Sequence, residues 1–129
     1  MYQKKILIIE DDEEMIALGK LIFEKEGYQV LSATNGPDGL DMLAETPVDL
    51  VLLDIMMNPM DGWQVLERIK SDNRFDRVPV IMLTARHFLE DPNGTKSHAH
   101  QFAGYIVKPF VVNNLLHEIQ GVLSTRPEE

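Results

Sequence analysis

The chain has 129 residues, of which 44% are hydrophobic, a size and composition typical of one globular domain. It contains no cysteine, which excludes disulfides, thiolate metal sites and a cysteine nucleophile. Its formal charge of -9 disfavours nucleic-acid binding by this domain, because phosphate backbones are also negative. No apolar run approaches the ~20 residues that span a membrane, and the N-terminus has no signal core, so we expect a cytoplasmic protein with no membrane partner.

Apolar runs alternate along the chain with segments whose apolar residues recur at helical spacing. The expected strands are 4–9, 29–33, 48–54, 78–83 and 105–107. The expected helical faces are Met15, Leu18, Gly19 and Ile22; Leu40, Leu43 and Ala44; Trp63, Leu66 and Ile69; and Val112, Leu115, Leu116, Ile119 and Leu123. The segment 86–102 has the weakest pattern, and its Asp-Pro-Asn-Gly run at 91–94 predicts a delayed or shortened fourth helix.

Strands that alternate with helices are typical of parallel sheets with right-handed crossovers, which place helices on both faces. We therefore predict an α/β fold of three layers, with a five-stranded parallel sheet in the order 2-1-3-4-5 and five helices. This is the flavodoxin-like arrangement. We assign residues 1–124 to this single domain and residues 125–129 to a polar C-terminal tail.

Polar side chains follow four of the expected strands at the point where each strand ends. Glu10 and Asp11 follow the first strand, and Asp54 ends the third. Thr84 follows the fourth strand, and Lys108 follows the fifth. These ends share one edge of a parallel sheet, where ligands bind in such folds. Each residue alone is more simply read as a helix cap, a turn or a solvated side chain, but their conjunction is unusual.

The residue types at this edge suit phosphoryl transfer to a carboxylate. Three carboxylates this close repel one another, and one becomes neutral unless a cation binds. Carboxylate oxygens are ligands that Mg²⁺ prefers. With the metal and Lys108 neutralising charge and Thr84 donating a hydrogen bond, Asp54 is placed to attack phosphorus in line. The small Ala85 leaves room for the transferred group.

At this point the residues resemble a known family, the receiver domain of two-component response regulators, and in particular its chemotaxis-receiver-like members. The matching motifs are Ile9-Glu10-Asp11, Asp54, Met60-Asp61-Gly62, Thr84-Ala85, and Tyr105 with Lys108-Pro109-Phe110. The resemblance covers essentially the whole chain. It implies that Asp54 takes a phosphoryl group from a histidine kinase or histidine phosphotransfer protein. It also implies that an unidentified downstream protein reads the phosphorylated state, and that the domain signals rather than acting as an enzyme.

The resemblance also implies roles for individual residues. The Mg²⁺ ligands would be Glu10, Asp11, Asp54 and the main-chain carbonyl of Met56. Lys108 would pair with the phosphoryl group and would precede a cis bond to Pro109. Thr84 and Tyr105 would form a switch pair, in which the hydroxyl moves toward the phosphoryl group and the ring turns inward. Met56 and Arg86 would lie beside the phosphoryl group and tune its lifetime.

The sequence departs from the family pattern in two places. Asn58 stands where the family usually has proline, and Pro59 follows it, which predicts a different shape for the loop after Asp54. Gln101 and Phe102 replace the usual Gly-Ala before the last strand, and the interval between Thr84 and Lys108 is slightly long. We therefore predict an atypical output face and a monomer or weak dimer.

Other functions remain as alternatives. A degenerate receiver would bind partners without phosphorylation. An aspartyl-phosphate phosphatase needs a second acid two residues after its nucleophile, where this chain has Met56. A flavin carrier of similar topology needs a Gly/Ser/Thr-rich phosphate loop after the first strand, and the acids at 10–12 are its electrostatic opposite.

Overall fold

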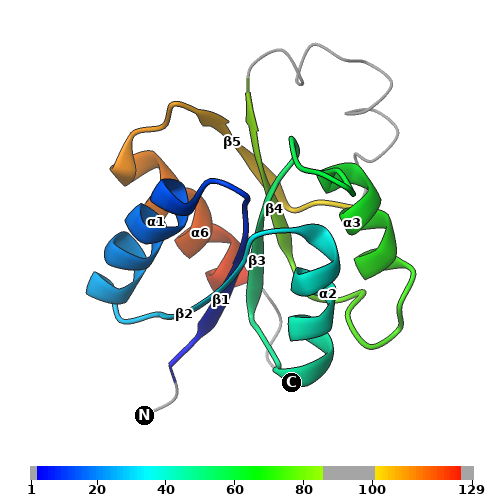
Figure 1. Ribbon diagram of the computed structural model, residues 1–129. Helices are drawn as coiled ribbons and strands as arrows, with labels where there is room; N and C mark the ends of the chain where they lie inside the picture. Colours follow the sequence, from blue (N-terminus) through cyan, green and yellow to red (C-terminus); the bar gives the residue numbers. More distant parts are fainter. Residues whose placement is uncertain (1–2, 86–100, 126–129) are drawn as a thin grey trace.

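The computed structural model describes residues 3–85 and 101–125, which form one parallel sheet flanked by helices. The described elements are β1 (Lys5–Ile9), α1 (Glu13–Lys25), β2 (Gln29–Ala33), α2 (Gly36–Glu45), β3 (Leu50–Asp54), α3 (Gly62–Lys70), β4 (Val80–Ala85), β5 (Gly104–Lys108) and α6 (Val112–Thr125). The strand order is β2-β1-β3-β4-β5, which confirms the predicted sheet. Helices α1 and α6 cover one face, and α2 and α3 cover the other (Figure 1). The expected fourth helix lies outside the described residues.

The central strands are buried on both faces, as their unbroken aliphatic runs predict. β3 is buried at every position, and β1 is buried from Ile6 onward. Alternate residues feed two cores: Ile8 packs in the core beneath α1 and α6, whereas Leu7 and Ile9 pack in the core beneath α2 and α3. The sheet therefore gives a rigid base to whatever its strand ends carry.

Three of the expected helical faces differ in part from the observed ones. Leu18 is 43% exposed, and α1 instead buries Ile16, Gly19, Ile22 and Phe23. Ala44 of α2 and Val112 of α6 are also exposed. The error arises because α1 carries apolar residues on neighbouring stripes, and periodicity alone does not decide which stripe meets the sheet.

Side-chain caps begin the first three helices just beyond the carboxyl ends of the first three strands. The Asp12 carboxylate accepts hydrogen bonds from two N–H groups at the start of α1. Asn35 caps α2 in the same way, and Asp61 forms a capping box with Gln64 at the start of α3. Such caps satisfy backbone donors that the helix itself leaves unpaired, so these residues set where each connection ends.

The loop between β3 and α3 closes back onto the strand it leaves. The Gly62 N–H donates to the Ile55 carbonyl oxygen at 2.8 Å. A Cβ at Gly62 would lie 2.4 Å from the Asp54 carbonyl oxygen, which is closer than real Cβ atoms come. Only glycine therefore fits here without a shift of the backbone. The Asn58–Pro59 bond inside this loop is cis.

The amino edge of the sheet is held by polar contacts to the backbone. The Asp49 carboxylate accepts a hydrogen bond from the Lys5 N–H at 2.8 Å. At the end of α3, the Lys70 ammonium donates to the carbonyl oxygens of Asp76 and Val78, at 3.1 and 2.6 Å. These contacts join neighbouring connections at the edge opposite the predicted site. Among the described helices, none has the length and apolar character needed to cross a bilayer.

Candidate functional site

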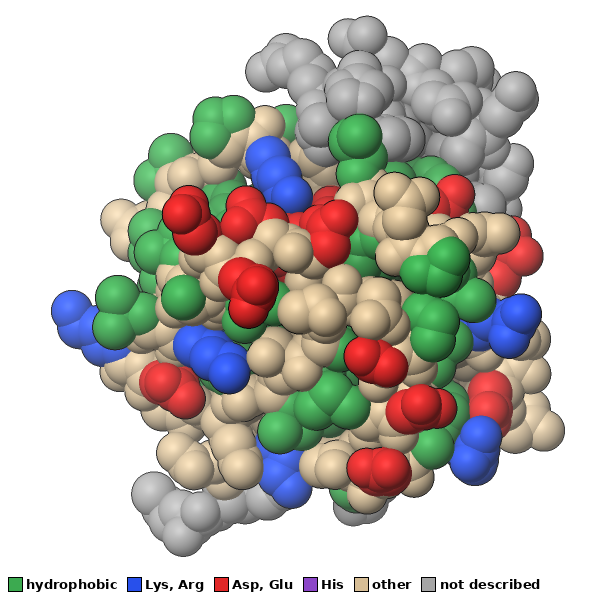
Figure 2. All heavy atoms as spheres, in the orientation of Figure 1, with side chains coloured by type: hydrophobic (Ala, Val, Ile, Leu, Met, Phe, Trp, Pro, Cys, Tyr) green, Lys and Arg blue, Asp and Glu red, His purple; other side chains and the backbone are tan. Residues whose placement is uncertain are grey.

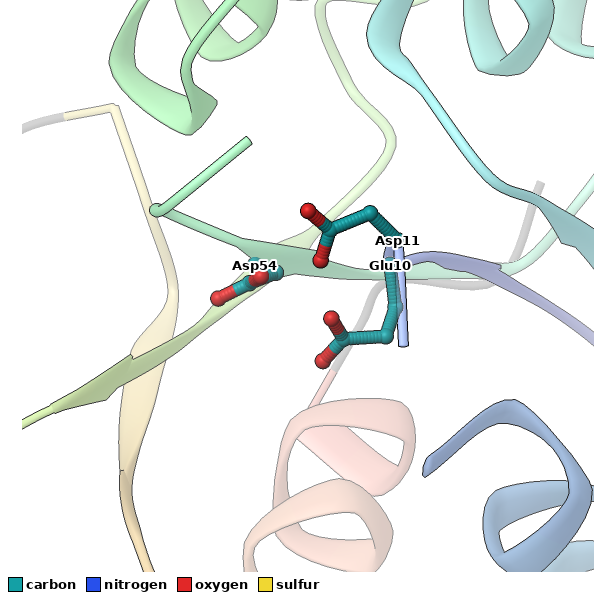
Figure 3. Close-up of side chains that lie close together, drawn as sticks. All are labelled: Glu10, Asp11 and Asp54. Atoms are coloured by element: carbon teal, nitrogen blue, oxygen red, sulfur yellow. The ribbon is translucent and has the colours of Figure 1, made fainter. Parts of the chain in front are cut away.

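Three acidic side chains meet at the carboxyl ends of β1 and β3, which are neighbours in the sheet. One carboxylate oxygen from each of Glu10, Asp11 and Asp54 lies within 4.8 Å of the other two, and the three side chains converge in Figure 3. Glu10 and Asp54 are 1% and 4% exposed, whereas Asp11 is exposed. The sequence prediction that these residues share one edge is therefore correct. Two carboxylates of the cluster are thus buried, and the third faces solvent.

Lys108 brings a positive charge to this cluster from the end of β5. Its Nζ lies 3.0 Å from Glu10 Oε1 and 3.3 Å from Asp54 Oδ1. β4 separates β5 from β3 in the sheet, so the long lysine side chain reaches past the end of β4. The Lys108–Pro109 bond is cis, as the resemblance implied. Lys108 thus holds together two acids that come from different strands.

The buried carboxyl of Glu10 has an unusual affinity for protons. Burial first, and then the hydrogen bond and the negative charge of Asp54, raise the pKa of Glu10 from 4.5 to about 7. The hydrogen bonds from Lys108 and from the Asp12 N–H, which lies 3.1 Å from Glu10 Oε2, act in the opposite direction. The hydrogen bond from Lys108 thus offsets only part of the cost of burying the Glu10 carboxylate beside Asp54. This is the electrostatic condition in which an added cation binds well.

The ammonium group of Lys108 stays protonated in this setting. Burial lowers its pKa, but the hydrogen bond to Glu10 and the negative charges of Asp54 and Glu10 outweigh that effect. The pKa of Lys108 is consequently raised above its ordinary value of 10.5. The side chain therefore acts as a fixed positive charge rather than as a proton donor near neutral pH.

The predicted switch residues lie on β4, which pairs with the strand of Asp54, and on β5, which is the next strand beyond it. Thr84 is buried near the end of β4, and its register partner on β5 is Val107. Tyr105 is 48% exposed, and its ring meets that of Phe102 edge-on with centroids 6.5 Å apart. In this structure the tyrosine ring is therefore turned to the surface. Its expected inward turn stays a prediction.

The residues expected around the phosphoryl group are only partly described. Met56 is 58% exposed, and its N–H lies 3.4 Å from Asp54 Oδ1. Ala85 is the last residue of β4, in register with Lys108. Arg86 lies outside the described residues, as do the histidines at 87, 98 and 100.

Several features of the site escaped sequence reasoning. The link from Lys108 to Glu10 joins residues 98 positions apart, and no local pattern marks it. The close approach of Gly62 to Asp54 was also missed, although Gly62 was part of a recognised motif. The hydrogen bond from Asp12 to Glu10 was detectable in principle, because a carboxylate two residues before a helix cap often accepts from that backbone.

The donor set of this cluster fits a hard divalent cation. Three carboxylates converge, two of them are buried, and Lys108 compensates for only part of their charge. Oxygen-only ligation with one open side suits Mg²⁺, which keeps waters and phosphate oxygens in its shell. Acidic side chains also gather on the upper part of the molecular surface in Figure 2, beside a basic side chain. Chemically, the site can hold a cation and present Asp54 beside it.

Comparison with known proteins points in the same direction. A family model described as the response regulator receiver domain matches residues 6–120. The transcriptional regulatory protein YkoG of Bacillus subtilis, itself uncharacterized, is 39% identical over 124 residues, which cover 95% of this chain and 52% of YkoG. The heme response regulator HssR of Staphylococcus epidermidis is 37% identical, over 91% of this chain and 50% of HssR. The chain spans about half the length of these curated relatives.

Solved structures agree with the sequence relatives. The N-terminal domain of a response regulator receiver protein from Methanoculleus marisnigri is 39% identical, with a TM-score of 0.76 over 93% of this chain and 96% of that domain. A CheY-like receiver domain protein from Methanospirillum hungatei is 30% identical, with a TM-score of 0.87 and 97% of both chains covered. Both similarities extend over nearly the entire chain.

Proposed function

This chain belongs to the family of response regulator receiver domains, which are signalling domains, and from that premise we propose that Asp54 is its phosphoryl acceptor. The donor is a histidine kinase or a histidine phosphotransfer protein. The observation that carries the proposal is the position of Asp54: a buried carboxylate at the end of the central strand β3, 3.3 Å from the Lys108 ammonium and beside two further acids.

The proposed reaction transfers a phosphoryl group to a carboxylate oxygen of Asp54. A bond forms between that oxygen and phosphorus, while the bond from phosphorus to the donor breaks and its electron pair leaves with the donor. Lys108 neutralises negative charge on the transferred group, and the hydroxyl of Thr84 donates a hydrogen bond to it. The rigid β3 strand holds the nucleophile in place, which lowers the entropic cost of reaching the transition state.

Glu10, Asp11 and Asp54 are the residues that would hold Mg²⁺, together with the main-chain carbonyl of Met56. When bound, the metal supplies positive charge to the carboxylates and to the phosphoryl oxygens. Glu10 helps to retain the cation while keeping its own contact with Lys108. Support for this assignment comes from the three carboxylates that converge within 4.8 Å and from the raised pKa of Glu10, which reflects its burial first and then the nearby Asp54.

In the proposed switch, phosphorylation first changes the distribution of charge at Asp54. Formation of the acyl phosphate places negative charge on the phosphoryl oxygens, beyond the present position of the carboxylate. Lys108 then pairs with the phosphoryl group, Thr84 moves toward it, and the ring of Tyr105 turns inward. An unidentified downstream protein reads this altered surface, so phosphorylation shifts a population between two states.

The deciding experiment is intact mass spectrometry after incubation with acetyl phosphate and Mg²⁺. We expect one added phosphoryl group on the unmodified chain, and none on Asp54→Asn or after removal of metal with EDTA. Asp49→Asn is a matched control, since Asp49 directly precedes β3 at the end opposite Asp54 and accepts a hydrogen bond from the Lys5 N–H. It should be phosphorylated normally.

Two results would overturn the proposal. Phosphorylation of Asp54→Asn would move the acceptor to another residue. No adduct on a folded chain that still binds Mg²⁺ would favour a receiver that binds its partner without phosphorylation. Circular dichroism on every variant separates either result from simple loss of folding.

A further inference from the structure

Three aromatic rings form a continuous row between α3 and β5. Trp63 lies in the first turn of α3, Phe102 precedes β5, and Tyr105 lies within β5. The Trp63 and Phe102 centroids are 5.9 Å apart with the rings tilted by 52°, and the Phe102 and Tyr105 centroids are 6.5 Å apart with the rings at 69°. Tilted and edge-to-face pairs at these separations are attractive.

One end of this row is tied to the acceptor strand. Trp63 directly follows Gly62, whose N–H is bonded to the Ile55 carbonyl and whose Cα packs against the backbone of Asp54. No side chain fits between Gly62 and the strand. The start of α3, and Trp63 with it, therefore has a fixed position relative to Asp54.

The other end of the row is the proposed switch tyrosine. Tyr105 is three residues before Lys108 on β5, and its strand pairs with β4 in the register that places Thr84 beside Val107. Its ring is 48% exposed, so burial alone does not hold it in this position. The ring contact with Phe102 supplies a directional interaction that favours the outward position.

Phe102 is itself firmly held. Its ring is half-buried against the core beneath α2 and α3, and the next residue, Ala103, donates its N–H to the Val80 carbonyl oxygen at 2.8 Å. It also stands in the pair of residues that departs from the family pattern before the last strand. A large ring at this position is thus both a peculiarity of this chain and the element that bridges Trp63 and Tyr105.

We propose that Phe102 is a positioning residue that holds the Tyr105 ring outward in the unphosphorylated domain and transmits its movement to Trp63. The inference rests on the proposed function, because the inward turn of Tyr105 belongs to it. When Tyr105 turns inward, its contact with Phe102 is lost and the row of rings rearranges. An aromatic pair of this kind favours the resting state by about threefold to tenfold.

Four variants of single phenylalanines test this role. Phe102→Leu keeps an apolar side chain on the core but removes the ring, Phe102→Ala removes both, and Phe102→Tyr restores a ring. Phe75→Leu is the control, because Phe75 is also half-buried against the same core, while its ring meets Arg74 at 4.7 Å instead of the switch tyrosine. A general loss of packing would affect Phe75→Leu and Phe102→Leu alike.

Two signals report on the row directly. Trp63 is the chain's single tryptophan, so its fluorescence reads one site. Tyr105 is followed by fluorine NMR of protein that contains fluorotyrosine, with Tyr105→Phe to assign its resonance. Beryllofluoride with Mg²⁺ serves as the probe, because it mimics a phosphoryl group on a carboxylate.

In the unmodified chain we expect beryllofluoride to shift the Tyr105 resonance and to change Trp63 emission. In Phe102→Leu and Phe102→Ala, beryllofluoride should bind about threefold to tenfold more tightly at equal Mg²⁺, and the change in Trp63 emission should be lost. Phe102→Tyr should restore both, and Phe75→Leu should match the unmodified chain. Unchanged affinity and an unchanged Trp63 response in Phe102→Leu would overturn the inference.

A second experiment uses the unphosphorylated protein alone and does not depend on phosphorylation. Without any phosphate analogue, Phe102→Leu should already broaden the Tyr105 resonance by exchange between outward and inward positions, whereas Phe75→Leu should not. If the unmodified chain takes neither beryllofluoride nor a phosphoryl group, the proposed function fails, and this resting spectrum still decides whether Phe102 positions Tyr105. A Tyr105 resonance that ignores Phe102→Leu overturns the positioning role by itself.

Discussion

The two edges of the sheet treat charged side chains in opposite ways. At the amino edge, the Asp49 carboxylate meets the Lys5 N–H, and the Lys70 ammonium meets two carbonyl oxygens. At the carboxyl edge, three carboxylates converge, and Lys108 contacts two of them. These two charged side chains at the amino edge meet backbone groups, whereas the carboxyl edge gathers like charges in one place.

This difference separates stabilising polar groups from functional ones. A carboxylate bonded to backbone N–H groups fixes a connection and leaves no strong demand for another ligand. Buried carboxylates that face one another cost free energy, which a protein recovers when a cation binds. The pKa of Glu10 is raised by its burial first and then by the neighbouring Asp54, and both contribute to that cost. A cluster of buried carboxylates with too few positive partners therefore identifies the functional site more clearly than burial or polarity alone.

The largest effect is expected from removing the positive charge of Lys108 at the carboxyl edge. Lys108→Met should slow phosphoryl uptake from acetyl phosphate by about 100-fold, since a charge that stabilises the transferred group is lost. Mg²⁺ should still bind, because all three carboxylates remain. Lys70→Met is the matched change at the amino edge and should leave the rate of uptake unchanged. Time-resolved intact mass and calorimetric Mg²⁺ titration measure these effects, and equal slowing by both variants would contradict the separation of the two edges.

The second effect concerns pH and the charge of Glu10. Its pKa is about 7 in the folded chain and 4.5 as the ordinary value, so the folded state holds a proton that the unfolded chain releases between these values. The resulting stability is fully present below about pH 4.5 and is lost as pH rises through about 7, by up to about 3 kcal/mol. Glu10→Gln carries no such proton.

Urea unfolding in EDTA tests this pH dependence. The unmodified chain should lose stability relative to Glu10→Gln between about pH 5 and about pH 8, and saturating Mg²⁺ should restore it at the higher pH. Carboxylates remote from Glu10 titrate alike in both proteins and cancel in the difference. A constant difference across this range would show that burial and Asp54 do not raise the pKa of Glu10 in the folded chain.

The smallest effect is expected at the amino edge. Asp49→Ala removes the acceptor of the Lys5 N–H and should cost about 1 to 2 kcal/mol of unfolding free energy. Phosphoryl uptake by the folded variant should equal that of the unmodified chain. Chemical denaturation gives the first quantity and intact mass the second. A clear loss of uptake would mean that the amino edge influences the site through the sheet.

Most of the fold was predictable because its signals are local. The aliphatic run that ends at Asp54 identified a strand buried on both faces, and the alternation of strands and helices gave the sheet order. The position of Leu18 was mispredicted, because two apolar stripes compete on α1. The meeting of Glu10, Asp11 and Asp54 followed from topology, since parallel strand ends share an edge.

The parts that escaped prediction depend on how far side chains reach across the fold. Lys108 contacts Glu10 over a separation that no spacing rule records. Phe102 was noticed as a departure, yet the sequence did not say that its ring meets Trp63 and Tyr105. Such contacts depend on side-chain packing between segments, and periodicity along one segment carries no information about it.

The closed loop after β3 has a consequence for how this sequence can vary. Its two ends are clamped together by the Gly62 N–H on the Ile55 carbonyl and by the lack of space for a side chain at Gly62. Residues at the ends are therefore intolerant of change, while those at the tip are comparatively free. Asn58 and Pro59, where this chain departs from the family's usual pattern, both lie at the tip. Substitutions at the tip can thus change the surface that this loop presents, while the acceptor strand keeps its geometry.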